Sequence, residues 1–130
     1  SGLMKDFPEP RAIDIGSATL SIHEAGAGPA IVLVHGWPEI AYSWKNQIGP
    51  LAAAGYRVIA PDLKGFGASS APRDKALYDI RHMTDDLVRL LDALAIERAI
   101  FCGHDWGGAI VWPMAQLHAD RVLGVISICT

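Results

Sequence analysis

The chain has 130 residues, of which 51% are hydrophobic and 19% charged, and its formal net charge is −3. This length is enough for one globular domain with its own core, and the composition excludes a disordered chain. Charges of both signs are dispersed, so nothing indicates nucleic-acid binding or a cationic membrane-surface helix. No apolar run reaches the length of a transmembrane helix.

The cysteines and the first residues bear on the compartment. Cys102 and Cys129 fall in different predicted strands, which is typical of small core residues and does not indicate a disulfide framework or a metal cluster. The N-terminus lacks the features of a signal peptide. We therefore expect a cytoplasmic protein without metal or cofactor, and a mature secreted protein remains the alternative.

The first half of the chain predicts an antiparallel hairpin followed by elements of a parallel sheet. Residues 12–15 and 18–24 alternate apolar and polar side chains around a Gly-Ser turn. Residues 30–34 (AIVLV) are continuously apolar, as in a strand that is covered on both faces. A helix over about 41–54, capped by Gly55, and a buried strand over 56–60 should follow.

The second half alternates helix and strand. After a long Gly-, Ser- and Pro-rich loop over 61–75, a helix begins at Asp79, and its apolar residues recur at spacings of three and four. A strand over 98–102, a helix over 109–117 and a buried strand over 121–129 complete the chain. The order predicts an α/β protein in which a mostly parallel sheet, starting with an antiparallel hairpin, is flanked by helices.

The turn between the predicted strand and the helix at 109 carries the most information. Residues 103–108 (GHDWGG) have the layout of the G-x-S-x-G nucleophile elbow, with Asp105 in place of serine. Gly103 and Gly107 allow the backbone to approach closely, and the N-terminus of the following helix stabilises negative charge. A carboxylate placed there can attack carbon and form an ester with the protein. The alternative, a solvated turn acid or helix N-cap, does not explain this glycine-rich setting.

A second motif, His35-Gly36-Trp37-Pro38, follows the first central strand. In elbow proteins the loop at this place supplies a second oxyanion donor, and here the candidate is the backbone N–H of Trp37, paired with that of Trp106. Pro38 has no N–H and fixes the direction of the loop. We interpret His35 as a structural hydrogen-bonding residue.

A third stretch, residues 62–69 (DLKGFGAS), lacks the third glycine of a dinucleotide-binding loop. We interpret it as a structural loop near the site, with Asp62 held by backbone donors.

We assign no chemical step to the other polar and aromatic residues. His104 precedes the apex, so its side chain should point to the opposite side, and no histidine is a convincing general base. Asp86 is interpreted as a solvated helix residue, and Trp44 and Trp112 as core residues.

With these motifs in view, the chain resembles the epoxide hydrolases of the α/β-hydrolase superfamily. The resemblance extends from about residue 12 onward and rests on HGWP, on GHDWGG and on residues 56–69. Haloalkane dehalogenases share the Asp-Trp elbow but typically carry Asn where this chain has Trp37, and Gly-Ser where it has Gly107-Gly108. Fluoroacetate dehalogenases usually have Arg in place of Trp106.

The resemblance implies a two-step reaction on a small apolar epoxide. An aspartate attacks an epoxide carbon while two tyrosines of a helical cap hydrogen-bond the epoxide oxygen. A histidine, oriented by an acid, then activates water to hydrolyse the ester to a vicinal diol. The implied site consists of Asp105 as nucleophile, Trp37 and Trp106 as oxyanion donors, Trp37, Pro38 and Trp106 as substrate contacts, and His35, Gly36, Gly103, His104 and Gly107 as structural neighbours.

The resemblance also implies that residues 1–130 are the N-terminal part of a hydrolase core domain. Cap, acid and base would lie beyond Thr130, on this polypeptide or on a complementary chain, and a homo-oligomer is left open. The isolated chain should be inactive. A haloalkane dehalogenase and a non-catalytic module of the same fold that binds small apolar ligands or a partner remain as alternatives.

Overall fold

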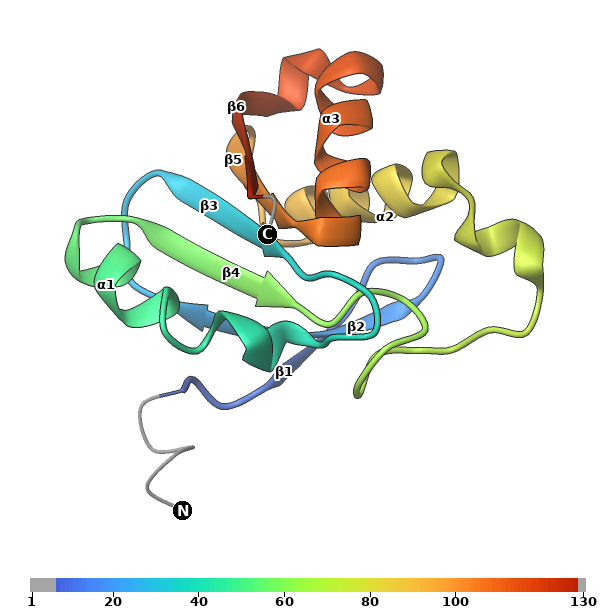
Figure 1. Ribbon diagram of the computed structural model, residues 1–130, viewed down its shortest axis with the longest axis horizontal. Coiled ribbons are helices and arrows are strands. Elements are labelled where there is room, and N and C mark those ends of the chain that lie inside the picture. The colour runs from blue at the N-terminus through green and yellow to red at the C-terminus, as the bar shows by residue number, and fades with distance from the viewer. Residues whose placement is uncertain (1–6, 129–130) are drawn as a thin grey trace.

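The computed structural model describes residues 7–128, which form one six-stranded sheet with helices on both faces (Figure 1). The strand order is β1-β2-β4-β3-β5-β6. Strand β2 is antiparallel to both its neighbours, β1 and β4, whereas β4, β3, β5 and β6 run parallel to one another. The predicted α/β architecture is therefore confirmed. The strands are β1 (Arg11–Asp14), β2 (Thr19–Ala25), β3 (Ala30–Val34), β4 (Arg57–Pro61), β5 (Ala99–His104) and β6 (Val122–Ile128).

The sheet separates two hydrophobic clusters, each of which is covered by helices. Figure 1 shows α1 on one side of the sheet and α2 and α3 on the other. Every residue of β3 is buried because this central strand is covered on both faces. The α-helices are α1 (Ile48–Ala53), α2 (Ile80–Ala93) and α3 (Gly108–Leu117), and the short 3-10 helices are η1 (Ala41–Trp44), η2 (Lys75–Tyr78), η3 (Asp105–Gly107) and η4 (Ala119–Arg121).

The single helix predicted over 41–54 is wrong, because the segment is split into η1 and α1. Proline has no N–H and its ring clashes with the carbonyl of the preceding turn, so a continuous helix would be broken at Pro50. In the first turn of α1 the missing N–H removes no intrahelical bond. Gly55 follows α1 with a φ of +100°, as expected of the glycine that ends a helix.

Helix α2 begins as predicted, because the carboxylate of Asp79 accepts a hydrogen bond of 2.8 Å from the backbone N–H of His82. Its buried residues face the sheet. Asp86 was predicted to be solvated, and this is wrong: it lies on the same helix face as Met83 and is only 5% exposed. The spacing of three residues from Met83 places it there.

Asp86 is accommodated by a buried ion pair. Its carboxylate lies 2.9 Å from Nζ of Lys64, which is 2% exposed, in an ion pair that lacks the geometry of a directed hydrogen bond. The hydroxyl of Ser17 donates a 3.0 Å hydrogen bond to the other carboxylate oxygen. The pair ties the loop after β4 to α2 and to the hairpin.

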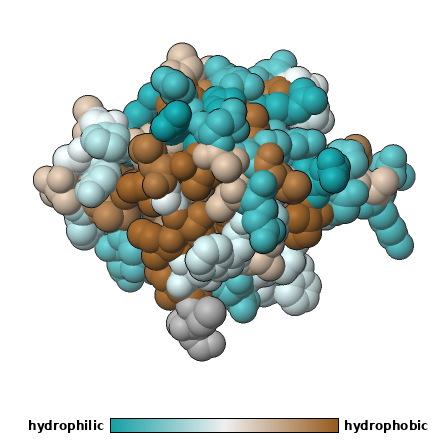
Figure 2. All heavy atoms as spheres, turned by 90° about the horizontal axis from the view of Figure 1, so that it is seen from above, coloured by the Kyte–Doolittle hydropathy of each residue, from teal (hydrophilic) through white to brown (hydrophobic). Residues whose placement is uncertain are grey.

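Strand β6 forms an edge of the described sheet and is not buried as predicted. Leu123, Ile126 and Ile128 are exposed, and so is Trp112 on α3, which was expected in the core. Figure 2 shows a continuous hydrophobic area on the face seen from above. An apolar run indicates that a strand is suited to burial but does not show which element covers it. Cys129, at the end of the predicted strand, lies outside the described residues.

The topology places two carboxyl ends side by side. β3 and β5 are parallel neighbours, but the chain continues from β3 to β4 on one side and from β5 to β6 on the other. Where strand order reverses in this way, the two connections diverge and leave a crevice beyond the strand ends. The loops that follow Val34 and His104 therefore meet at the edge of the sheet where ligands bind in such folds.

Replacing Lys64 by Met should lower the free energy of unfolding by about 3–5 kcal/mol, because the buried carboxylate of Asp86 loses its counter-charge. Chemical denaturation measures the change. The double variant Lys64→Met/Asp86→Leu should recover most of the loss, since it leaves no unpaired charge. Equal destabilisation of the single and double variants would contradict an electrostatic origin.

Candidate active site

Asp105 lies at the apex of a sharp strand-to-helix turn. It follows β5 directly and has a φ of +55°, in the left-handed region that residues other than glycine rarely adopt. Such a conformation persists only where the surroundings enforce it, and it is concentrated at functional sites. The turn leaves Asp105 exposed at the carboxyl edge of the sheet.

Close packing around the apex explains the flanking glycines. A Cβ on Gly103 would lie 2.4 Å from the carbonyl oxygen of Gly107. A Cβ on Gly107 would lie 2.2 Å from the carbonyl oxygen of Val34, at the end of β3. These neighbours are backbone atoms and cannot rotate away, so the turn folds in this form only with glycine at both positions.

The loop of residues 35–38 crosses directly beside this turn. A Cβ on Gly36 would lie 2.9 Å from the carbonyl oxygen of His104 and 3.1 Å from Cβ of Asp105. Trp37, Asp105 and Trp106 together line a concavity of about 550 Å³. Pro38, joined to Trp37 by a cis peptide bond, is exposed and is not among the residues that line it. Two motifs that are far apart in the sequence thus meet at one concavity.

His35 is completely buried beneath the site and joins two loops. Its Nε2 accepts a hydrogen bond of 3.0 Å from the backbone N–H of Leu63, so the proton is on Nδ1, which donates to the carbonyl of Gly36 at 2.8 Å. Burial lowers the pKa of His35, and the hydrogen bond to Gly36 opposes this only in part. A neutral imidazole with both nitrogens engaged holds backbone in place and has no free nitrogen to act as a base.

The loop after β4 is fixed by Asp62, which is 4% exposed. As predicted, its carboxylate accepts from backbone donors, at 2.8 Å from the N–H of Ala41 and at 3.2 Å from that of Ala68. Gly67 has a φ of +52°, and a Cβ there would lie 2.3 Å from this carboxylate. The loop also carries Phe66, which the motif analysis did not single out. The aromatic residue between two glycines was the available signal.

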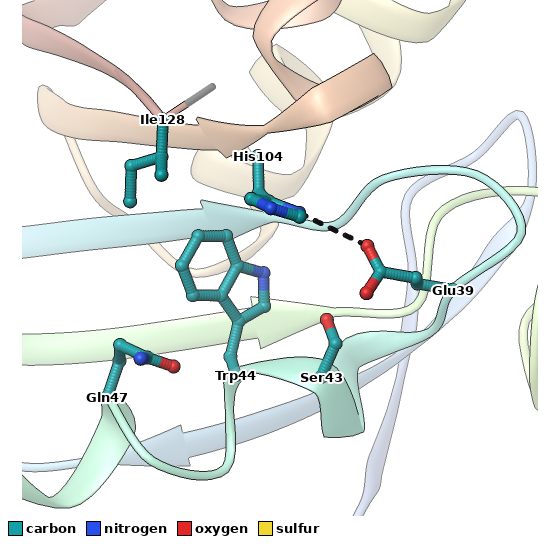
Figure 3. Close-up of a pocket in the computed structure, with 6 residues that line it drawn as sticks. All are labelled: Glu39, Ser43, Trp44, Gln47, His104 and Ile128. Atoms are coloured by element: carbon teal, nitrogen blue, oxygen red, sulfur yellow. Dashed lines mark hydrogen bonds and ion pairs between the residues drawn. The ribbon is translucent and has the colours of Figure 1, made fainter. Parts of the chain in front are cut away.

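His104 and Asp105 line different pockets. Figure 3 shows His104 directed toward Glu39, and its Nδ1 lies 3.3 Å from a carboxylate oxygen of that residue. The pocket in this view, of about 260 Å³, lies away from the concavity of Asp105. Within the described part of the chain, the buried Nε1 of Trp44 has no hydrogen-bond partner there. The residues that line the pocket are Glu39, Ser43, Trp44, Gln47, His104 and Ile128.

Two findings concern cofactors and membranes. Among residues 7–128, no group of three or more His, Cys, Asp or Glu side chains is placed to hold a metal ion. No helix in this part of the chain combines the length and the apolar character that crossing a bilayer requires.

The chain has many relatives among known proteins. Residues 29–130 match the family model described as alpha/beta hydrolase fold. The chain is 49% identical to "Epoxide hydrolase A" of Mycobacterium tuberculosis over 123 residues, which is 93% of this chain but 38% of that protein. It is 48% identical to "Bifunctional epoxide hydrolase 2" of Sus scrofa over 107 residues, 82% of this chain and 19% of that protein.

Solved structures agree in fold. Epoxide hydrolase A from Mycobacterium thermoresistibile superimposes with a TM-score of 0.89 at 48% identity, covering 92% of this chain and 38% of that one. An epoxide hydrolase from Vigna radiata gives a TM-score of 0.90 at 33% identity, covering 95% of this chain and 40% of that one. The chain thus spans about two fifths or less of the length of these relatives. Because the family model matches residues 29–130, which is most of the chain, the chain belongs to the alpha/beta hydrolase fold family.

Proposed function

We propose that the complete protein is an epoxide hydrolase, converting a small apolar epoxide and water into a vicinal diol, with Asp105 as its nucleophile. The observation that carries the proposal is the carboxylate of Asp105 at the apex of a left-handed elbow, in one concavity with two tryptophans. The relatives that are named epoxide hydrolases support it.

The first half of the reaction uses the carboxylate as a nucleophile. One oxygen of Asp105 attacks an epoxide carbon, the bond from that carbon to the epoxide oxygen breaks, and the freed oxygen takes a proton from an acidic donor. The product is an ester between Asp105 and the substrate. Trp37 and Trp106 offer apolar walls to the substituents of the epoxide, because both line the same concavity.

The second half regenerates the enzyme. Water, deprotonated by a base, attacks the ester carbonyl carbon of Asp105, the diol leaves as the carboxylate re-forms, and the proton held by the base returns to the group that protonated the epoxide oxygen. The carbonyl oxygen carries negative charge in between, and we assign the backbone N–H groups of Trp37 and Trp106 to stabilise it. The segment that leads to Trp37 lies against the elbow that contains Trp106, since a Cβ on Gly36 would lie 3.1 Å from Cβ of Asp105.

We further propose that this chain is the N-terminal part of the core domain. The proton donors, the acid and the base histidine would be supplied by polypeptide after residue 130 or by a complementary chain. Two observations support this: the relatives are more than twice as long, and Asp105 is exposed, whereas efficient displacement requires exclusion of bulk water. The cytoplasm is the proposed compartment, which the free, buried thiol of Cys102 supports.

Replacing Asp105 by Asn in the complete protein should lower the rate of diol formation on the order of 10⁴-fold, the scale seen when a member of a catalytic unit is removed. No covalent adduct should form, because the amide is a poor nucleophile. Asp120→Asn, the same change at an exposed acid of η4, is the control and should retain activity. A covalent ester located on another residue would refute the assignment.

Diol formation should exceed halide release when the complete protein is offered epoxides and haloalkanes of matched carbon skeleton. Gas chromatography of the diol and ion chromatography of the halide measure the two rates. Preferential halide release would favour a haloalkane dehalogenase. Absence of both products, with ligand binding retained, would favour a binding module.

The isolated 130-residue chain should show no diol formation above background, because the proposed base and proton donors are not part of it. The assay is the same, with the complete protein as the positive control. Clear turnover that Asp105→Ala abolishes would show that the described residues suffice for both half-reactions.

A further inference from the structure

Phe66 lies between the two segments to which the oxyanion donors are assigned. Its ring centroid is 5.1 Å from that of His35, with an interplanar angle of 73°. On another side it is 6.2 Å from the ring of Trp106, with an angle of 46°. Both distances fall within the range of favourable aromatic pairs. Phe66 therefore touches the loop that leads to Trp37 and also the elbow residue Trp106.

The loop that carries Phe66 is anchored at both ends. At its start, Asp62 accepts from Ala41 and Ala68, and the N–H of Leu63 donates to His35. At its end, the hydroxyl of Ser69 donates to the carbonyl of Asp62 and accepts from the N–H of Ser21. A side chain on a loop this constrained can hold its neighbours in place.

His35 connects this loop to the segment that contains Trp37. The same imidazole that packs on Phe66 donates to the carbonyl of Gly36, the residue directly before Trp37. On its other side, Phe66 packs against the indole of Trp106, and the backbone N–H of Trp106 is the second proposed donor. A displaced Phe66 ring would thus loosen both donors together, although it touches neither N–H itself.

We propose that Phe66 is a positioning residue for the oxyanion donors, and that it acts mainly on hydrolysis of the Asp105 ester. The inference rests on the proposed function. Charge develops on the carbonyl oxygen when water attacks the ester, so misplaced donors slow that step. In the first half-reaction the carboxylate loses charge, and stabilisation by these donors favours the reactant. A looser oxyanion hole should therefore slow hydrolysis without slowing ester formation.

The test is single-turnover kinetics of Phe66→Leu in the complete protein, with quenched samples analysed by mass spectrometry for the ester on Asp105. Loss of one donor costs about 10²–10³ in rate, and displacement should cost less, so we expect hydrolysis to slow about tenfold. Ester formation should keep its rate, so that the ester accumulates. Phe66→Tyr, which keeps the ring, should restore the wild-type ratio of the two rates.

Phe7→Leu is the matched control. Like the partly buried Phe66, the buried Phe7 packs on a histidine, 4.4 Å from the ring of His23, but it belongs to the N-terminal segment and packs against Tyr42. It should lower stability and leave the ratio of hydrolysis to ester formation unchanged. If Phe66→Leu does not fold, Phe66→Met, which fills more of the space, takes its place in the same measurement.

An unchanged ratio in Phe66→Leu, or an equal change in Phe7→Leu, would overturn the positioning role while leaving the proposed function intact. Failure of the proposed function has a different signature, because the wild-type protein would then form neither ester nor diol.

Discussion

The close contact between the elbow and the end of β3 is the constraint on which the site depends. There is no room for a side chain between Gly107 and the carbonyl oxygen of Val34, nor between Gly103 and the backbone of Gly107. This contact brings the turn after β5 against the loop after β3, and it forces Asp105 into a left-handed conformation. The strain at one residue is balanced by the hydrogen bonds and buried surface of two parallel strands that are covered on both faces.

The sequence was most informative where a local backbone requirement selects a residue type. The glycines around Asp105 report a close backbone approach, Gly55 after α1 a positive φ, and Asp79 before α2 a capping hydrogen bond, and the structure has them as expected. The parallel sheet followed from apolar runs alternating with helical periodicity. The split of the helix ahead of Pro50 was also readable, because proline there marks a first turn.

The errors arose where the outcome depended on neighbours distant in sequence. Asp86 looks like a solvated helix acid until Lys64 is placed beside it, and that pairing is a property of the tertiary fold. Leu123, Ile126 and Ile128 of β6 and Trp112 were expected in the core, but they are exposed in the described structure. Phe66 was missed for the same reason, since only the fold brings the rings of His35 and Trp106 to it.

Under the proposed function, the geometry separates the placing of the nucleophile Asp105 from its activation. The elbow holds the Asp105 carboxylate where a reacting carbon can reach it, and it does so with backbone contacts that lie wholly within this chain. An exposed carboxylate, however, keeps its hydration, and hydration must be displaced before the oxygen can attack carbon at a useful rate. Trp37, which is itself 63% exposed, and Trp106 supply only part of an apolar enclosure. Under the proposed function, the remaining wall would also carry the proton donor for the epoxide oxygen, because leaving-group protonation and water exclusion coincide. Under that proposal, one covering element that brings both the apolar wall and the proton donor would complete the first half-reaction.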